Sequence, residues 1–289
     1  MDWVVAVSAS EADGRELAPA TEAAARAALE EHGCILLRGA FPPATIKAMH
    51  REYVSQLGPR DLAAMETEVK KPPPNRFLAV GPARFDTTLR MTGAFGRTEV
   101  FANDLLLKFL RPLLGKDMRL NSFTAVTSYP GAPEQQPHRD HDHLYPQPGV
   151  GANLPIYAVN VAVPLIDVDL TTGPTGVWLG SHRSGRSVAV RSKDMTASPL
   201  RRGDCMVLDY RTLHAGLSNR SALTRPIVYM VYGRRWFFDD VNYVNRIPLD
   251  MPLEHYHELP ETVRPLLVRA FSYAMLTRWH EADLQIERR

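Results

Sequence analysis

The chain has 289 residues, of which 45% are hydrophobic and 23% are charged, and its formal net charge is +2. These are the proportions of an ordinary globular protein, and the length allows one large core. Such a small net charge is untypical of a nucleic-acid-binding protein, and no apolar run reaches the 18 residues of a membrane span. We therefore expect neither a nucleic-acid partner nor a membrane.

The first residues, MDWVVAVSASEADG, have no basic start and no long apolar run, which argues against a secretory leader. The two cysteines, Cys34 and Cys205, lie in apolar segments that are typical of strands. A chain of this size does not need a disulfide to fold. We interpret both thiols as reduced and buried, in a cytoplasmic protein.

Helical patterns dominate the first third of the chain. Residues 19–32 are rich in Ala and Glu and end at a glycine, which predicts a helix, and residues 34–37 (CILL) predict a short strand. A second helix is predicted over residues 43–57, and Asn103 is a suitable N-cap for the segment NDLLLKFLRPLL. The apolar residues at helical spacing in 43–57 are Ile46, Met49, Tyr53 and Leu57.

The pattern changes at about residue 118. From there to about residue 235 the chain is a series of short β-rich runs between Gly, Pro and Asp residues: RLNSFTAVTSY, IYAVNVAVPLI, SVAV, CMVLDY and PIVYMVY. Many short strands between turns are typical of a sandwich or barrel. Residues 260–279 return to helical periodicity. The sequence therefore predicts a β core that helices from both ends of the chain cover.

The tripeptide His138-Arg139-Asp140 suggests a metal site. Two His and one carboxylate on one face can bind Fe(II) and leave positions open for co-substrate and O₂. Residues at i and i+2 of a strand point to the same side, so His138 and Asp140 meet that need. The third ligand must come from a distant strand. His214 lies near the end of the run DYRTLHAG, and we expect alternate side chains from Leu208 to His214 to share a strand face.

This tripeptide alone leaves other interpretations open. It lies in the charged, Pro-flanked segment QQPHRDHDHLYPQP, which is also compatible with a solvated loop. His141 and His143 form a second pair at the same spacing, and Asp142 follows Asp140. A Zn(II) site that uses these histidines is therefore an alternative.

The downstream sequence favours the first interpretation. Arg225 lies eleven residues after His214 and opens the run RPIVYMVYG, and a guanidinium there suits a carboxylate of a co-substrate. The ordered segments HRDH, TGPTGVWLGSHR and RRGDCMVLDYRTLHAGLSNRSALTRPIVYMVY resemble the phytanoyl-CoA dioxygenase family across residues 118–235. The segment HGCILLRGAFPPATIKAMH is similar to the N-terminal strand and helix of that family.

The resemblance implies a mainly β fold, a double-stranded β-helix (jelly-roll, cupin-like) core flanked by α-helices. We expect a single domain over residues 1–289. Helical wrapping is expected over about 1–117, the β core over about 118–240, and a helical tail over about 241–289.

The resemblance also implies the cofactors and their ligands. It implies three ligands for Fe(II), namely His138, Asp140 and His214. It places the co-substrate 2-oxoglutarate on Arg225, with further contacts from Gln136 and from Thr175 of the GPT turn; Gln135 competes with Gln136 for this role. O₂ is the second co-substrate, and ascorbate is expected to help in vitro. Leu179 departs from the family, in which Pro usually precedes the G-S-H sequence.

Asp140 bears on the type of reaction, because related halogenases have a small residue there to admit chloride. We expect hydroxylation or another oxidation of a small molecule, with decarboxylation of 2-oxoglutarate to succinate. The weaker candidates for substrate contact are Tyr145, Asn160 and Arg90. Arg76, Arg84 and Arg90 lie in a stretch punctuated by Pro and Gly, and we interpret them chiefly as surface charges.

Two other functions remain compatible with the sequence. One is an oxygenase of the same chemistry that acts on a protein side chain. The other is a cupin-like Zn(II) binding protein or isomerase. We favour a small free metabolite of specialised metabolism as the substrate, because no basic cluster for CoA phosphates is evident. The sequence does not distinguish a monomer from a homodimer.

Overall fold

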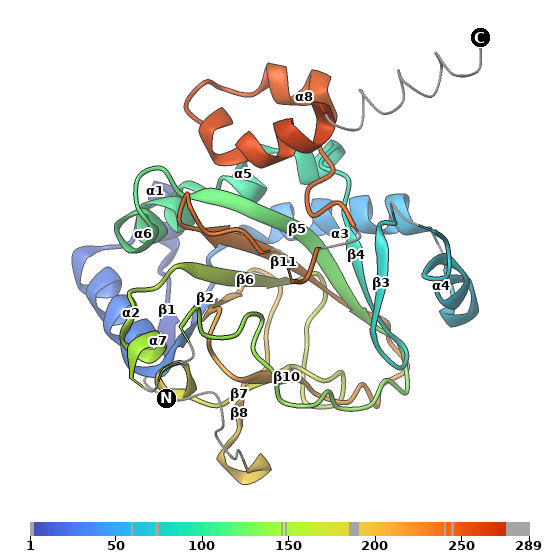
Figure 1. Cartoon of the computed structure of the whole chain (residues 1–289), viewed down its shortest axis with the longest axis horizontal. Helices are drawn as coiled ribbons and strands as arrows, with labels where there is room; N and C mark the ends of the chain where they lie inside the picture. The colour runs from blue at the N-terminus through green and yellow to red at the C-terminus, as the bar shows by residue number, and fades with distance from the viewer. Residues whose placement is uncertain are drawn as a thin grey trace.

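An eight-stranded sheet forms the centre of the molecule (Figure 1). The computed structural model describes residues 3–58, 60–72, 75–145, 147, 149–184, 191–239, 241–243 and 246–275. In order across the sheet, the strands are β1 (Val4–Ala6), β2 (Cys34–Arg38), β9 (Cys205–Asp209), β6 (Ala158–Pro164), β11 (Arg225–Gly233), β5 (Arg119–Ser128), β4 (Arg84–Thr88) and β3 (Phe77–Gly81). All neighbouring strands are antiparallel except β1 and β2.

A smaller sheet lies below the large one in Figure 1. Its strands are β10 (His214–Gly216), β7 (Thr175–Val177) and β8 (Thr196–Ala197). On its other side, β10 pairs with the segment that carries the H-x-D tripeptide. The backbone N–H groups of His138 and His214 each donate to the other residue's carbonyl, both at 2.9 Å. This pairing brings residues that are far apart in the sequence into contact.

Helices cover the face of the large sheet that is opposite the small sheet (Figure 1). They include α2 (Pro19–His32), α3 (Pro43–Leu57) and α6 (Asp104–Leu114), and the predictions for 19–32 and 43–57 are confirmed. Asn103 is the N-cap of α6, since its side chain accepts from the backbone N–H of Leu106 at 3.1 Å. The other helices are α1 (Ala9–Gly14), α4 (Leu62–Glu68), α5 (Thr98–Phe101), α7 (Val150–Asn153) and α8 (Leu253–Glu258), with 3-10 turns at Gly93–Gly96, Ser181–Arg183, Ser192–Asp194 and Arg264–Leu267.

Alternation along the strands divides the large sheet into two faces. Phe123 and Ala125 of β5 are fully buried in the main hydrophobic core, between the sheet and the helices. Thr124 and Val126 point the other way and line a cavity on the opposite face of the sheet. The helices therefore stabilise the sheet from one side, and its other side is available for a site.

The run DYRTLHAG is not one strand, and the expectation that Leu208 and His214 share a strand face is wrong. The large sheet ends at Asp209, and the small sheet begins at His214. A turn separates them, in which Thr212 N donates to Asp209 O at 2.8 Å. A buried ion pair between Arg211 Nη2 and Asp209 Oδ2, at 2.6 Å, holds this turn.

The large sheet also takes strands from the segment for which we expected helical wrapping. Besides the predicted β2, this segment contributes β1, β3 and β4. The run SVAV (187–190) lies outside the described residues, as does the end of the helix predicted over 260–279, of which residues 268–275 are helical.

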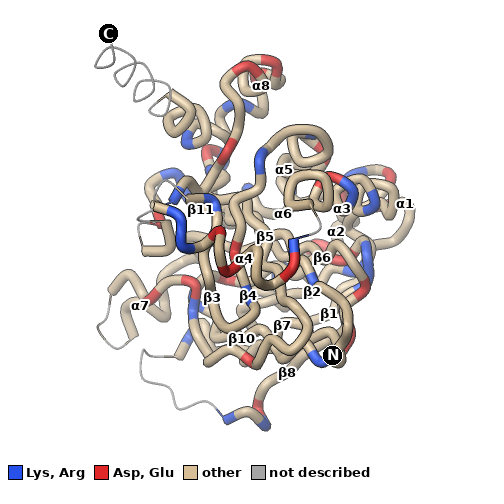
Figure 2. The backbone as a smooth tube through the Cα atoms, turned by 90° about the vertical axis from the view of Figure 1, so that its right-hand side faces the viewer, with Lys and Arg blue, Asp and Glu red and all other residues tan. Residues whose placement is uncertain are grey.

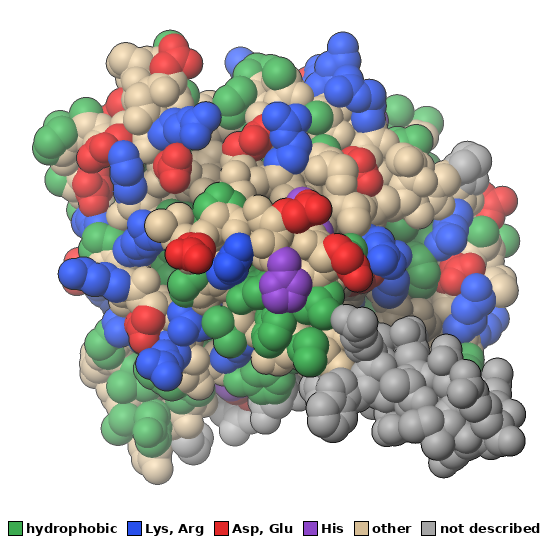
Figure 3. Space-filling view, turned by 90° about the horizontal axis from the view of Figure 1, so that it is seen from above, with side chains coloured by type: hydrophobic (Ala, Val, Ile, Leu, Met, Phe, Trp, Pro, Cys, Tyr) green, Lys and Arg blue, Asp and Glu red, His purple; other side chains and the backbone are tan. Residues whose placement is uncertain are grey.

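The surface carries charges of both signs. Lys and Arg are interspersed with Asp and Glu along the chain (Figure 2), and the face in Figure 3 shows the same mixture with hydrophobic side chains near its centre. Within the described residues, none of the helices has the length and apolar character needed to cross a membrane.

Candidate metal centre and its cavity

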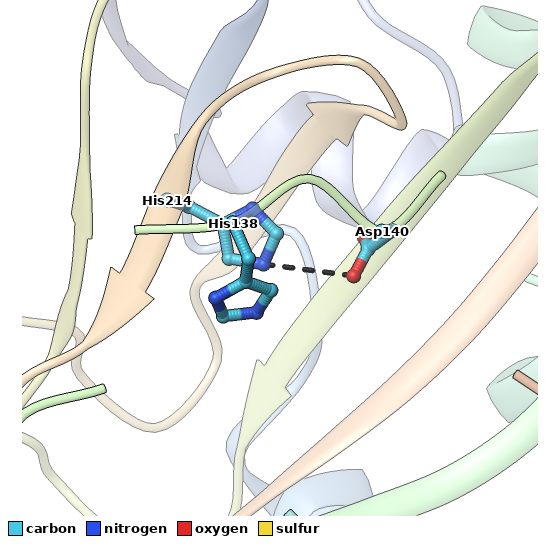
Figure 4. A group of neighbouring side chains, drawn as sticks. All are labelled: His138, Asp140 and His214. Carbon is cyan, nitrogen blue, oxygen red and sulfur yellow. Dashed lines mark ion pairs between the residues drawn. The ribbon is translucent and has the colours of Figure 1, made fainter. Parts of the chain in front are cut away.

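Three residues from two chain segments form a group that can hold a metal ion. Ligand atoms of His138, Asp140 and His214 all lie within 4.8 Å of one another. His214 comes from the start of β10, and His138 lies beside it on the paired segment, two residues before Asp140. The two imidazoles and the carboxylate point toward one another (Figure 4), and His214 Nε2 is 3.6 Å from Asp140 Oδ1. The structure thus brings together all three predicted ligands.

Hydrogen bonds orient the two imidazoles. His138 Nδ1 is 2.8 Å from the carbonyl of Gln136, and His214 Nδ1 is 3.0 Å from the carbonyl of Thr212. A carbonyl only accepts, so each Nδ1 carries the proton and each Nε2 is free to bind a metal. Burial lowers the pKa of His138, and the neighbouring His214 lowers it further. The neutral imidazole that a metal requires is therefore favoured.

Two asparagines hold Asp140, the carboxylate residue of this group. Asn160 of β6 donates from Nδ2 to Asp140 Oδ2 at 3.1 Å. Asn242, in the connection between β11 and α8, donates to the backbone carbonyl of Asp140 at 2.8 Å. These contacts restrict both the rotamer and the backbone of Asp140, which is how outer residues commonly fix a metal ligand.

The neighbouring histidines make other contacts. His143 is buried, and its Nε2 is 2.9 Å from the carbonyl of Ser184. The ring of His141 packs edge-on against Phe237, with centroids 5.4 Å apart. In the part of the chain that the structure describes, His138, Asp140 and His214 form the only group with metal-binding geometry. This arrangement favours an iron site over the Zn(II) alternative, because two His and one carboxylate are what Fe(II) oxygenases use.

The metal group opens into a cavity of about 640 Å³. Pockets of 300–1,000 Å³ typically hold small molecules. One end is formed by His138 and Asp140 together with Arg84 and Gln135. The lining includes Leu78, Val80 and Pro82 from the hairpin of β3 and β4, Asp86 of β4, Val126 of β5, Asn160 of β6, Tyr229 and Val231 of β11, and Asn242, Tyr243 and Arg246 from the connection that follows β11.

Two buried arginines lie at the metal end of the site. Arg84 and Arg225 are each 1% exposed, and both pair with Ser128, from opposite sides of β5. Burial lowers the pKa of both guanidiniums, and the charge of Arg225 helps to lower that of Arg84 to about 10. Among the described residues, neither arginine has an ion pair and neither Nε has a hydrogen-bond partner. Two adjacent buried cations in this state favour the binding of an anion.

The interpretation of Arg84 as a surface charge is therefore wrong. Arg84 is the first residue of strand β4, and Asp86, two residues later, faces the same side of that strand. The alternation of Arg84 and Asp86 was the available signal. The hairpin that they belong to pairs with β5, some forty residues later in the chain, and this pairing is what buries them.

The other predicted contacts lie in different places. Thr175 is buried on β7, with its hydroxyl 3.5 Å from that of Tyr229. Gln136 is exposed at the cavity, whereas Gln135 is half-buried and accepts from Gly216 N at 3.0 Å. A Cβ at Gly216 would contact both Gln135 and Arg84, so these side chains converge on that glycine.

The three predicted substrate residues do not lie together. Asn160 lines the cavity. Tyr145 lines a separate pocket of about 530 Å³ with Trp236, and it is 53% exposed. Arg90 is exposed and bridges to Asp250 through its backbone, away from the cavity lining.

A family model described as phytanoyl-CoA dioxygenase matches residues 29–227. Among characterised proteins, the dioxygenase aneA of Aspergillus aculeatus is 28% identical over 205 residues, which cover 67% of this chain and 65% of the relative. The multifunctional dioxygenase ausE of Emericella nidulans is 24% identical over 250 residues, or 81% of this chain and 78% of the relative. The chain thus spans just under two thirds of the first relative and nearly four fifths of the second.

Solved structures share the fold. The epimerase SnoN from nogalamycin biosynthesis, described as non-haem and α-ketoglutarate-dependent, superposes with a TM-score of 0.56 at 17% identity, over 80% of this chain and 91% of SnoN. HygX from Streptomyces hygroscopicus, crystallised with nickel and 2-oxoglutarate, gives a TM-score of 0.55 at 15% identity, over 74% of this chain and 89% of HygX.

These findings confirm several predictions. The mainly β jelly-roll core with flanking helices is confirmed, and so are the dioxygenase class and its cofactors, iron and 2-oxoglutarate. The family match covers more than half of the chain and includes all three predicted metal ligands. The chain therefore belongs to the phytanoyl-CoA dioxygenase family.

Proposed function

We propose that this chain hydroxylates a small molecule, with Fe(II), 2-oxoglutarate and O₂ as its cofactor and co-substrates. One observation carries the proposal. The group of His138, Asp140 and His214 opens into the same cavity as Arg84, next to which Arg225 is buried without an ion pair among the described residues. The site therefore combines the ligand set of an iron site with two buried arginines whose charges a bound anion would compensate.

The residues present fit both groups. His138, Asp140 and His214 would hold Fe(II) on one face and leave open positions. Arg225 lies four residues before Tyr229 on the cavity-facing side of β11, so it would bind the distal carboxylate of 2-oxoglutarate together with Arg84. Thr175 and one of the two glutamines would supply further hydrogen bonds. Gln135 is better placed than Gln136, because it converges with Arg84 on Gly216.

Iron and 2-oxoglutarate together supply the activation of O₂, and the co-substrate leaves as succinate and CO₂. The protein's own residues orient these groups and exclude water. Asp140 occupies the position that a halide would need, so oxygen transfer is the favoured outcome. Among relatives, okaE of Penicillium ochrochloron is named an iron/α-ketoglutarate-dependent dioxygenase, which agrees with this assignment.

A small molecule is favoured over a protein side chain as the substrate. The hairpin of β3 and β4 and the connection after β11 both contribute to the cavity lining, so the site is recessed between them. SnoN is an epimerase from nogalamycin biosynthesis, and this role of a protein with the same fold supports a natural product as the substrate class.

The proposal is tested with purified protein loaded anaerobically with Fe(II) and 2-oxoglutarate. We expect one bound iron per chain, an absorption band from the iron–2-oxoglutarate complex, and succinate formation once O₂ is admitted. His138→Ala and His214→Ala should lose all three. His141→Ala is the matched control, because the ring of this neighbouring histidine packs against Phe237, and it should keep them. Iron binding and turnover equal to wild type in both ligand variants would refute the proposal.

A further inference from the structure

A buried ion pair lies in the lining of the cavity, in addition to the metal group and the two arginines described above. Asp86 of β4 and Arg246 of the connection after β11 form it, and their side chains are 11% and 6% exposed. The guanidinium of Arg246 also lies over the ring of Tyr243, 4.6 Å from its centroid. Asp86, Arg246 and Tyr243 all line the cavity. The pair therefore belongs to the wall that a substrate would meet.

This pair is not fully hydrogen-bonded. Asp86 Oδ1 and Arg246 Nη1 are buried without a hydrogen-bond partner among the described residues. Asn160 is also only partly hydrogen-bonded. Its Nδ2 donates to Asp140, whereas its Oδ1 is buried with no partner among the described residues. Buried polar atoms in proteins are nearly always hydrogen-bonded, so these three atoms are available to hydrogen-bond a molecule in the cavity. They offer two acceptors and one donor.

Few charges in the lining are available to meet a charge on a buried part of the substrate, since Glu134 also lines the cavity but is exposed to solvent. Asp86 and Arg246 neutralise each other. Arg139 also reaches the lining, but its guanidinium turns away and donates to the carbonyls of Arg211 and Ser181. The remaining cation, Arg84, lies beside Arg225 and is assigned above to the co-substrate. A charged group on the substrate would thus be buried without a counter-charge, which is costly.

The lining also offers apolar surface to a substrate. Leu78 and Val80 of β3 contribute from the hairpin, and Val126 and Val231 contribute from the floor of the cavity. Apolar side chains with a few convergent polar groups are typical of sites for small organic ligands. The cavity therefore presents an apolar surface with a polar, electrically neutral edge.

We propose that the substrate is an uncharged molecule with hydroxyl groups along one edge, and that Asp86, Arg246 and Asn160 recognise this edge. Hydroxyl groups donate to Asp86 Oδ1 and Asn160 Oδ1, and a substrate oxygen accepts from Arg246 Nη1. Carboxylic acids, amines and acyl-CoA thioesters are selected against. This inference rests on the proposed function, because it assumes that the metal and 2-oxoglutarate occupy the residues assigned to them above.

The test is a binding screen with enzyme loaded anaerobically with Fe(II) and 2-oxoglutarate. The probes are ring compounds in matched forms: neutral polyols and their methyl ethers, the corresponding carboxylic acids and amines, and acyl-CoA thioesters. Binding is measured from the shift of the iron–2-oxoglutarate band, and turnover from succinate above the rate without a probe. We expect the tightest ligands among the neutral polyols, at least tenfold tighter than their acids, amines or ethers.

Two outcomes would overturn the inference. One is that acids, amines or thioesters bind best. The other is that no neutral polyol binds although the absorption band and the basal succinate formation are present. Loss of the band and of basal succinate would instead count against the proposed function, so the two failures are distinguishable.

Substitutions in the pair give a second test. Asp86→Asn leaves Arg246 without its counter-charge, so it should weaken binding of the best polyol about tenfold and shift the preference toward its carboxylic acid. Arg246→Lys keeps the positive charge, and it should preserve the preference for neutral compounds even if affinity falls. Asp167→Asn is the matched control, because it alters an Asp–Arg pair that is 59% exposed on both sides. An Asp86→Asn protein with wild-type affinity and preference would contradict the role of the pair.

Discussion

Arg225 shows how much of this site depends on single buried side chains. It is 1% exposed at the start of β11, and no described residue forms an ion pair with it. A cation is retained in such an environment only if a ligand or a partner compensates its desolvation. The buried charge of Arg225 therefore favours a dicarboxylate co-substrate near the metal group, and it is a more direct argument than the spacing of the motifs.

Substitution of Arg225 should therefore weaken 2-oxoglutarate binding. Arg225→Met removes a paired, charge-assisted hydrogen bond, which is worth roughly 1.5–3 kcal/mol, or about ten- to a hundredfold in affinity. The affinity is measured by anaerobic titration of the iron-loaded protein with 2-oxoglutarate. Iron affinity should stay the same. Arg220→Met, at an exposed arginine on the turn before β11, is the control. Equal 2-oxoglutarate affinity in both variants would show that Arg225 does not bind the co-substrate.

At the scale of elements, the turn between β9 and β10 determines where His214 lies. The turn moves the chain from the large sheet to the small one within Tyr210–Leu213. Its main support is the ion pair of Arg211 with Asp209, whose side chains are 2% and 1% exposed. Arg211 also donates to the carbonyls of Gly151 and Leu154, at 3.0 and 2.8 Å.

Removal of one partner of this pair should be strongly destabilising. Arg211→Met leaves Asp209 as an uncompensated buried charge, which typically costs 3–5 kcal/mol. We expect the free energy of unfolding to fall by about 3 kcal/mol or more, measured by urea denaturation of the metal-free protein. Arg202→Met provides the contrast, since its pair with Asp167 is exposed and should contribute less than about 1 kcal/mol. Similar losses in both variants would contradict this account.

The sequence was sufficient for elements whose signals are local. Helix α3 was predicted because the same four apolar residues that repeat at helical spacing are the ones that it buries. The H-x-D tripeptide was informative because alternation places His138 and Asp140 on one side. Strands β3 and β4 were missed, because their burial depends on pairing with β5, which no local pattern encodes. For the same reason Arg84 was interpreted as a surface residue.

At the scale of the whole molecule, buried histidines couple stability to pH. Burial lowers the pKa of His182, which is 4% exposed, with its Nε2 3.0 Å from the carbonyl of Glu30. Burial also lowers the pKa of His50 and of His138. Below the ordinary value of about 6.5 the unfolded chain binds these protons, while the native state still resists them. The native state therefore loses stability as the pH falls from about 6.5.

This dependence is measurable in the metal-free protein. The free energy of unfolding should be nearly constant from pH 8 to 7 and should decrease from about pH 6.5 downward, apart from contributions of the carboxylates at lower pH. His182→Gln removes one of the groups, so its stability should fall less steeply over the same interval. His257→Gln, at an exposed residue of α8, is the control and should keep the wild-type slope. A slope that His182→Gln leaves unchanged would exclude the contribution of this imidazole.

The two partners of the cavity ion pair, Asp86 and Arg246, come from different kinds of structural element. Asp86 is fixed in a strand of the central sheet, whereas Arg246 belongs to a connection between secondary-structure elements. Changes in such a connection alter few core contacts, so they are tolerated more readily than changes in the sheet. The same connection, however, also carries Asn242, whose side chain holds the backbone of Asp140. An exchange of this connection would therefore change what the cavity accepts and the position of a candidate metal ligand together.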